Sequence, residues 1–223
     1  MNLPDEDQRR SLLAIPWFAG QSAEQAAAMV KAGRLVRRNA GEWLHGEGDE
    51  ETGLLAVLDG RLKLYCQAPG EREVLIGVMP AGSVMGQSAT FGGGPRLLTV
   101  IAAADSLVFT VSDRALRQTA AEHPGVWRDV AGLLYMQLGA ILQLVAQLTA
   151  LPPRARLAAR LLQLEQNLGV AEVSQGDLAE MVGVTRKAIN GWLGEMAAKG
   201  WVRLGYGRIE ILKPGSLRAV VAA

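Results

Sequence analysis

The stretch VSQGDLAEMVGVTRKAINGWLGEMAAKGWVRLGYGRIEIL, residues 173–212, decides how the C-terminal third folds. Ser174 starts a capping-box pattern, which opens a short helix. Gly183 stands in the following turn, where a left-handed backbone is needed. Thr185 then caps a second helix that reaches about Ala198. The apolar residues between these signals fall where two crossed helices would bury them, and this predicts a helix-turn-helix: Leu178, Ala179, Val184, Ile189 and Leu193.

The second helix of such a unit presents its early outward side chains to DNA. Here those side chains are Arg186, Lys187 and Asn190. Arginine and lysine donate to guanine O6 and N7, and asparagine pairs with adenine N6 and N7. Near the two helix N-termini stand Ser174, Gln175 and Thr185, in positions where hydroxyl and backbone N–H groups hold phosphates.

A second hairpin follows the two helices. Residues 201–204 and 208–212 are apolar-polar strands on either side of Gly205-Tyr206-Gly207, and Arg203 and Arg208 flank the tip. A helix-turn-helix followed by a two-stranded wing is typical of a winged DNA-binding domain. The alternative, a plain helical hairpin with a solvated polar face, does not account for this added hairpin.

Charge is divided unevenly along the chain. The net charge of the 223 residues is +1, but residues 1–151 carry −3 and residues 152–223 carry +4. A polyanionic partner is therefore expected to meet the C-terminal third.

Composition excludes several classes of protein. With 49% apolar and 20% charged residues, the chain is neither disordered nor fibrous. We expect no secretory signal and no membrane anchor. One cysteine cannot build a disulfide framework, so a cytoplasmic location is expected.

The N-terminal part predicts short helices followed by strands. Ser22 heads an alanine-rich helix, and residues 35–111 are rich in strand patterns. Residues 54–58, Asp59-Gly60 and residues 61–66 predict a hairpin. Glycine and proline recur about every ten residues, which is typical of a small antiparallel barrel or roll.

A long helix is predicted over residues 125–151, and Pro152-Pro153 ends it. Its apolar residues form a heptad seam, with a second apolar row beside it. One apolar side of this helix can pack on the barrel. The other side can pack against the same helix of a second subunit, or, as the alternative, against a later domain of the same chain. The interface residues predicted for a homodimer are Val130, Leu134, Gln137, Ile141, Leu144 and Leu148.

The predicted fold class is α+β: an N-terminal antiparallel β-roll or jelly roll with flanking helices, a long dimerisation helix and a C-terminal winged helix-turn-helix. We place an effector domain at residues 1–124, the long helix at 125–151 and the DNA-binding domain at 152–223.

This order of elements resembles the Crp/Fnr family of bacterial transcription regulators. The similar segments, besides the helix-turn-helix, are residues 15–20, 41–44, 47–49, 57–61, 82–89 and 95–100. The resemblance implies a homodimer that binds double-stranded DNA at a two-fold related operator. It also implies that an effector reaching the barrel changes transcription through RNA polymerase, with no membrane involved.

By this resemblance the effector pocket comprises Gly86, Gln87, Ser88, Ala89, Arg96, Leu97, Ile141 and Leu142. Members that bind cyclic AMP use glutamate where this chain has Gln87, and a hydroxyl residue where it has Leu97. They also offer hydroxyls where residues 140–142 are apolar here. Arg96 alone remains as an anion ligand. The prediction is a regulator without the usual cyclic AMP site, and the effector is left open as another nucleotide or a different small molecule.

Other functions remain as alternatives. The regulator could be constitutive, if Leu97, Ile141 and Leu142 plug the pocket. The chain shows neither a catalytic triad nor a P-loop, so an enzyme is not expected. A protein-binding module that has lost DNA affinity would not need its exposed arginines. Cys66 is expected to be a buried inert thiol rather than a redox switch. His45 stands in a turn region and is the candidate axial ligand if the protein senses through haem, an alternative that the sequence supports poorly.

Overall fold

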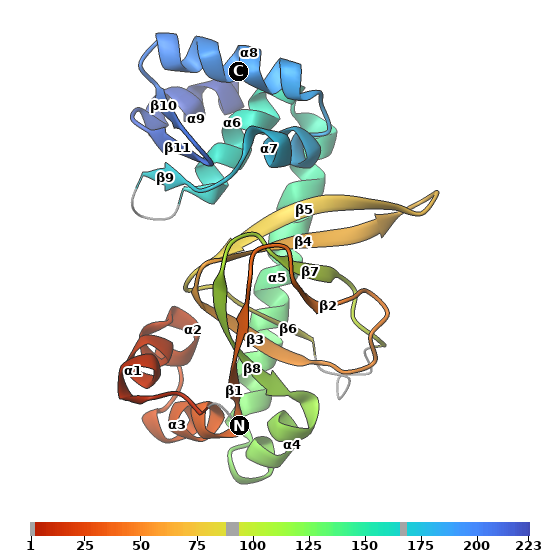
Figure 1. Ribbon diagram of the computed structural model, residues 1–223, viewed down its shortest axis with the longest axis vertical. Helices are drawn as coiled ribbons and strands as arrows, with labels where there is room; N and C mark the ends of the chain where they lie inside the picture. Colours follow the sequence, from red (N-terminus) through yellow and green to blue (C-terminus); the bar gives the residue numbers. More distant parts are fainter. Residues whose placement is uncertain (1–2, 88–93, 166–168) are drawn as a thin grey trace. The chain divides into compact units, whose positions relative to one another are not determined.

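The structure is a computed structural model that describes residues 3–87, 94–165 and 169–223 (Figure 1). The chain divides into two compact units, Met1–Gly139 and Ala140–Ala223, and each is described by itself. Helix α5 (Gly125–Ala150) contributes residues to both units.

The first unit combines helices with two antiparallel sheets. Its helices, besides the start of α5, are α1 (Glu6–Ala14), α2 (Pro16–Ala19), α3 (Ala23–Ala32) and α4 (Asp113–Glu122). Its strands are β1 (Arg34–Arg38), β2 (Trp43–His45), β3 (Gly53–Asp59), β4 (Arg61–Ala68), β5 (Arg72–Pro80), β6 (Val84–Gln87), β7 (Thr99–Ala102) and β8 (Ser106–Ser112). The Ser22 hydroxyl accepts from the backbone N–H of Gln25, so the predicted start of α3 is confirmed.

The strands form two four-stranded sheets, in the orders β1-β8-β3-β6 and β2-β7-β4-β5. Alternation along β3 divides its side chains between two cores. Leu54 and Ala56 pack with the helices, while Leu55 and Val57 pack with residues of the other sheet, such as Leu62. The predicted antiparallel roll is confirmed, and its interior lies between the two sheets.

The predicted hairpin across Asp59-Gly60 is wrong. Strand β3 pairs with β6 and β8, whereas β4 pairs with β5 and β7, so the two strands belong to different sheets. Gly60 has a φ of +79°, and a Cβ there would collide with the carbonyl of Asp105. The dipeptide does mark a turn, but β3 is buried on both faces and takes a neighbour on each side, which excludes β4.

The first part of α5 belongs to the core of the first unit. Val126, Val130 and Leu133 are buried there. The indole N–H of Trp17 donates to the carbonyl of Asp129 at 3.2 Å, and the side chain of Gln25 donates to its carboxylate. These bonds tie α2 and α3 to α5. Val130 was predicted to face a second subunit; that is wrong, because its own chain buries it completely.

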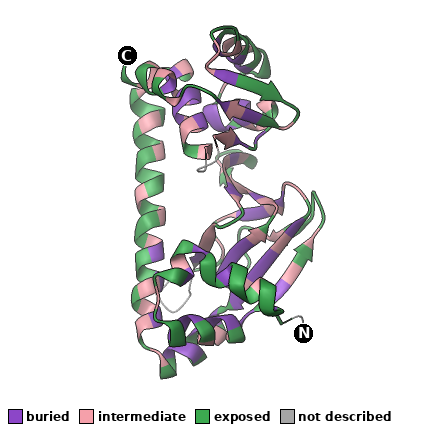
Figure 2. Cartoon of the chain, turned by 90° about the vertical axis from the view of Figure 1, so that its left-hand side faces the viewer, coloured by how far each residue is buried: buried purple, intermediate pink, exposed green. Residues whose placement is uncertain are grey.

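The later part of α5 is exposed and apolar (Figure 2). The exposed side chains on one face of the helix are Leu138, Ile141, Leu142, Val145 and Leu148. Of the predicted seam, Leu134, Gln137 and Leu144 are half-buried. By length and composition alone α5 would also pass as a membrane span, a weak criterion for a single helix.

The second unit holds the remaining helices and a three-stranded sheet in the order β10-β11-β9. Its helices, besides the end of α5, are α6 (Pro153–Leu164), α7 (Gln175–Val182), α8 (Arg186–Ala198) and α9 (Pro214–Ala222), and its strands are β9 (Val170–Ala171), β10 (Val202–Gly205) and β11 (Arg208–Ile211). The predicted helix-turn-helix and wing are both confirmed, and the α+β class with them. Strand β9 was not predicted, because two residues carry no readable period.

Candidate nucleic-acid interface

Helices α7 and α8 begin and end where their local sequence dictates. The Ser174 hydroxyl accepts from the backbone N–H of Asp177 at 3.0 Å, and the Thr185 hydroxyl accepts from that of Ala188 at 3.2 Å. Between the helices, Gly183 adopts a left-handed φ of +73°. The two caps and this turn set the angle at which α8 leaves α7.

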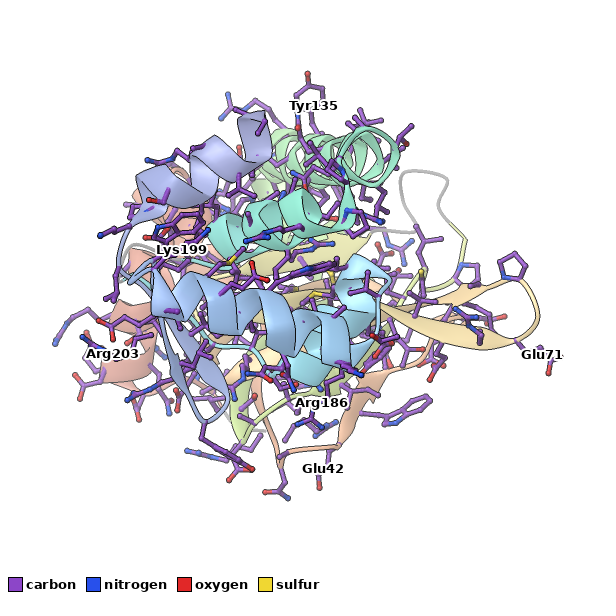
Figure 3. All side chains as sticks on the ribbon, turned by 90° about the horizontal axis from the view of Figure 1, so that it is seen from above. Glu42, Glu71, Tyr135, Arg186, Lys199 and Arg203 are labelled. Atoms are coloured by element: carbon purple, nitrogen blue, oxygen red, sulfur yellow. The ribbon has the colours of Figure 1, made fainter. Side chains whose placement is uncertain are left out.

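Helix α8 has one buried and one exposed face. Ile189, Leu193 and Met196 are completely buried. The exposed side chains of its first turns are Arg186, Lys187 and Asn190, the three residues predicted to read bases. Figure 3 shows Arg186 at the start of the helix. The structure therefore brings the predicted base-reading residues together on one surface.

The predicted phosphate-binding residues lie at the starts of the two helices. Ser174 and Thr185 are exposed, and Gln175 is half-buried. Each capping hydroxyl accepts a backbone hydrogen bond and still keeps its own O–H to donate. Together with the helix N-termini, these groups can hold anionic oxygens.

The wing separates its two arginines. Arg203 and Glu210 are opposite each other in the β10–β11 register and form an ion pair at 2.6 Å. Arg208 is exposed and lies next to Gly205, where an added Cβ would come within 3.0 Å of the Arg208 Cγ. Both arginines were predicted to bind DNA, but Arg203 is already engaged within the strand pair.

A further ion pair offsets the negative charge on α8. The carboxylate of Glu195 lies 2.7 Å from the guanidinium of Arg154, which belongs to α6. A carboxylate on this helix would repel a phosphate backbone, and the pair reduces that repulsion.

The first unit contains a cavity of about 340 Å³. Its polar and charged lining includes Arg34, Arg38, His45, Asp49, Glu51 and Arg96. Among the predicted effector residues that the structure describes in this unit, Arg96 alone lines the cavity. Its guanidinium donates from Nε to the carbonyl of Glu51 at 2.9 Å and from Nη1 to the carbonyl of Gly53 at 3.0 Å.

The other predicted effector residues are placed differently. Gly86 is buried in β6 against Leu54. Gln87 ends the strand, and Ser88 and Ala89 lie outside the described residues. Leu97 is exposed and does not line the cavity. Ile141 and Leu142 are exposed within the second unit.

His45 lines the cavity, although the sequence analysis named it only as a candidate haem ligand. Burial, and then the charge of Arg96, lowers the pKa of His45 to about 4. Backbone groups of Leu98 and Gly46 and the carboxylate of Asp49 oppose this shift only in part. The ring is therefore neutral at pH 7, and neither nitrogen makes a hydrogen bond of ordinary geometry to a described residue. Nothing in the sequence pattern around this histidine could have shown its burial.

Cys66 is half-buried, which is less than predicted. Burial, with a smaller contribution from Glu47, raises the pKa of the Cys66 thiol, so the unreactive protonated form is favoured. No group of three or more histidine, cysteine, aspartate or glutamate side chains in the described parts of the chain could hold a metal ion.

Two sequence profiles match this chain, one on each side of α5. The profile of the cyclic nucleotide-binding domain matches residues 35–123, and that of the Crp-like helix-turn-helix domain matches residues 155–220. Together they cover more than half of the chain. The chain belongs to the Crp/Fnr family. It is a transcription regulator with a cyclic-nucleotide-binding-type sensor domain and a helix-turn-helix.

Relatives within the Crp/Fnr family match over most of the chain. The CRP-like cAMP-activated global transcriptional regulator of Mycobacterium tuberculosis is 27% identical over 196 residues, 84% of this chain and 88% of that protein. The cyclic AMP receptor protein of Thermus thermophilus is 24% identical over 207 residues, 92% of this chain and 96% of its own. Among solved structures, FixK2 of Bradyrhizobium japonicum shares the fold, with a TM-score of 0.77 at 20% identity over 86% of this chain and 98% of that one.

Proposed function

We propose that this regulator is a homodimer that reads a two-fold related operator through α8 and responds to a small molecule in its first unit. The observation that carries the proposal is the exposed face of α8. Arg186, Lys187 and Asn190 share it, while the opposite face is completely buried. An exposed cationic and amide surface at the start of such a helix suits the major groove.

In this proposal Arg186 and Asn190 contact bases, and Lys187 contacts either a base or a phosphate. Ser174, Gln175 and Thr185 hold the phosphates beside the groove. The net charge of +4 on residues 152–223 supports a DNA partner for this part of the chain. Contact with RNA polymerase and a cytoplasmic location complete the proposal, in which the chain is a regulator and not an enzyme.

The dimer interface we propose is the exposed apolar part of α5. It keeps Leu134, Gln137, Ile141, Leu144 and Leu148 from the predicted seam and leaves out Val130. It adds the exposed residues Leu138, Leu142 and Val145. Apolar side chains at these spacings form a continuous stripe, and a second copy of the helix would cover it.

For the effector, we propose a ligand other than cyclic AMP. Arg96 donates to two backbone carbonyls, and Leu97 offers no side-chain donor beside it. These two carbonyls occupy two of the five N–H groups of Arg96, which fixes the guanidinium and leaves fewer donors for a cyclic phosphate. The cavity of about 340 Å³, whose lining includes Arg96 and which Leu97 does not line, supports a ligand-responsive regulator over a constitutive one.

DNA binding is tested by fluorescence anisotropy with a selected operator and a random duplex. Arg186→Ala is expected to cost about 1–3 kcal/mol on the operator and to relax specificity at one base pair of each half-site. The matched control is Arg218→Ala, which removes an exposed arginine of α9. Equal losses on both duplexes would assign Arg186 to phosphates and contradict base reading.

The effector is tested by the same assay with cyclic AMP, cyclic GMP or cyclic di-GMP at two salt concentrations. We expect cyclic AMP to leave operator affinity unchanged. If cyclic AMP tightens operator binding, the proposal of a different effector is wrong. Binding that is specific and indifferent to all three nucleotides directs the search to other small molecules.

A further inference from the structure

Strand β1 carries two arginines on the inner face of the roll. Arg34 lies opposite Thr110 of β8, which in turn lies opposite Leu55 of β3. Residues directly opposite each other in a sheet share a face, and Leu55 belongs to the core between the two sheets. Arg34, and Arg38 four residues later, therefore lie on the inner side of β1. Both of them line the cavity of about 340 Å³.

Three of the described residues that line the cavity are arginines, and two of these are held by backbone carbonyls. Arg38 donates from Nε and Nη1 to two carbonyls at 2.8 Å and 2.9 Å, and Arg96 does the same at 2.9 Å and 3.0 Å. The side chain of Arg34 makes no hydrogen bond or ion pair to a described residue. Arg34 is also exposed, so it lies where the cavity meets solvent. Its five N–H groups are therefore available to a bound molecule.

The charged residues around the cavity leave a surplus of positive charge. Asp49 and Glu51 line it as well, whereas His45 is neutral at pH 7. Burial lowers the pKa of Arg96, and the carboxylates of Glu51 and Asp49 partly offset this effect, so both carboxylates lie near Arg96. Three arginines and two carboxylates give a net charge of +1. A ligand with a single negative charge would balance it.

The rest of the cavity wall is mainly aliphatic, and it includes Val36, Leu44 and Leu55. None of the described residues in the wall is aromatic. A volume of about 340 Å³ lies near the lower end of the range for ligand sites, which is about 300–1,000 Å³. The cavity therefore suits a compact ligand with an aliphatic body.

We propose that this cavity binds a small aliphatic monocarboxylate, with its carboxylate on the guanidinium of Arg34 and its carbon chain among Val36, Leu44 and Leu55. This inference rests on the proposed ligand response of the first unit, and it names the class of the ligand. A guanidinium offers two parallel N–H groups to a carboxylate, and such charge-assisted pairs are strong. Arg96 keeps its two carbonyls and adds its charge to the cavity.

An inward arginine on β1 has a second explanation. This strand is at the edge of its sheet, and inward charges on edge strands discourage pairing with another chain. The two roles differ in what Arg34→Gln changes. Loss of a ligand contact lowers ligand affinity, whereas loss of edge protection increases self-association. The position of Arg34 in the wall of a cavity favours the first role.

The test measures ligand binding by isothermal titration calorimetry with the full-length protein and no DNA. The probes are octanoate, its neutral analogue octanamide, and acetate, which has the carboxylate without the chain. We expect octanoate to bind more tightly than octanamide by about 10-fold or more, and acetate to bind more weakly still. From butanoate to hexanoate to octanoate, affinity should rise about 4-fold for each added methylene.

Variants of β1 assign the carboxylate to one arginine. Arg34→Gln should weaken octanoate binding about 10- to 100-fold and leave octanamide binding unchanged. Arg34→Lys keeps the charge without the planar fork and should give an intermediate affinity. The matched control is Arg37→Gln, because Arg37 is exposed on the other face of the same strand and should not affect octanoate. Equal thermal midpoints of the ligand-free variants separate lost binding from lost folding.

Three results would overturn the inference. One is octanoate binding no more tightly than octanamide, and another is an equal loss of octanoate affinity in Arg34→Gln and Arg37→Gln. The third is Arg34→Gln that self-associates in sedimentation but binds octanoate as the wild type does, which would assign Arg34 to edge protection.

Operator anisotropy with and without octanoate separates this inference from the proposed function. If octanoate binds through Arg34 and leaves operator affinity unchanged, the ligand class is correct and the proposed ligand response is wrong. If octanoate does not bind while another small molecule changes operator affinity, the proposed function holds and only the ligand class is wrong.

Discussion

The imidazole of His45 lies in the cavity of the first unit, and its pKa is lowered to about 4 by burial and by Arg96. In the unfolded chain the same group titrates near its ordinary value of about 6.5. Above that pH the ring is neutral in both states and contributes nothing to pH dependence. Between about 6.5 and 4 the unfolded chain binds a proton that the folded chain does not, so stability falls as the pH falls.

We expect this difference to cost the wild type on the order of 1–2 kcal/mol at pH 4 relative to pH 7, after allowance for the exposed part of the ring. His45→Gln removes the titrating group and should flatten that part of the curve. The measurement is the urea midpoint between pH 4 and 7.5. Asn39→Gln, which changes an exposed residue that does not titrate, is the matched control and should follow the wild type. Parallel curves for wild type and His45→Gln would contradict the expectation.

Some residues of the two candidate sites could be predicted from the sequence, and others could not. Arg186, Lys187 and Asn190 could be predicted from their spacing in one helix, because the position of a residue along a helix determines which face its side chain lies on. The position of His45 in the cavity could not be predicted, since its partial burial depends on strands far away in the sequence. The carbonyl partners of Arg96 belong to the backbone, and no sequence pattern reports them.

Two glycines interrupt helix α8 on its exposed face. At Gly191 and Gly194 an added Cβ would meet nothing within 4 Å, so neither glycine is needed for packing inside the chain. Each costs the helix about 1 kcal/mol relative to alanine. These glycines lie on the face of α8 that also carries Lys187 and Asn190. Because they have no side chains there, the wall of the DNA major groove can approach the helix backbone closely.

Gly191→Ala and Gly194→Ala should therefore raise stability by about 0.5–1 kcal/mol each and weaken operator binding at the same time. The readouts are the thermal midpoint and the anisotropy of the same samples. Gly132→Ala in α5, also exposed and in open space, is the matched control. It should raise stability without changing DNA affinity. Tighter or equal operator binding by the α8 variants would contradict the close approach.

At the level of elements, helices were easier to predict than strand partners. The ends of α7 and α8 follow from Ser174, Gly183 and Thr185, which act on their own neighbours in the chain. The failure at Asp59-Gly60 has the opposite cause. A turn signal is local, but whether β3 pairs with β4 depends on strands that arrive from residues 84–87 and 106–112.

The molecule as a whole exposes an apolar stripe on α5, and the proposed dimer covers it. Leu142 is 59% exposed within the stripe, and Met136 is 58% exposed on the opposite side of the same helix. This pair gives a matched test of the interface. A charged side chain is poorly tolerated at a buried apolar interface and well tolerated in water.

Leu142→Glu should shift the sedimentation coefficient from dimer to monomer, whereas Met136→Glu should not. Loss of the second half-site contact should lower operator affinity about 100-fold for Leu142→Glu. Equal behaviour of the two variants would contradict the proposed interface. Recovery of the wild-type chain in the membrane fraction would instead assign the stripe to lipid.

The two units differ in how far apart in sequence their paired strands lie. In the first unit, Arg34 of β1 is opposite Thr110 of β8, 76 residues later. In the second unit, Arg203 and Glu210 are only 7 residues apart. Closing long loops slows folding, so refolding after dilution from urea should be fast for the second unit and slower for the first. Pulse-labelled hydrogen exchange would separate the two phases. During synthesis the order of emergence is the reverse: the sensor unit leaves the ribosome first, yet its sheets remain incomplete until residue 112 is free to pair.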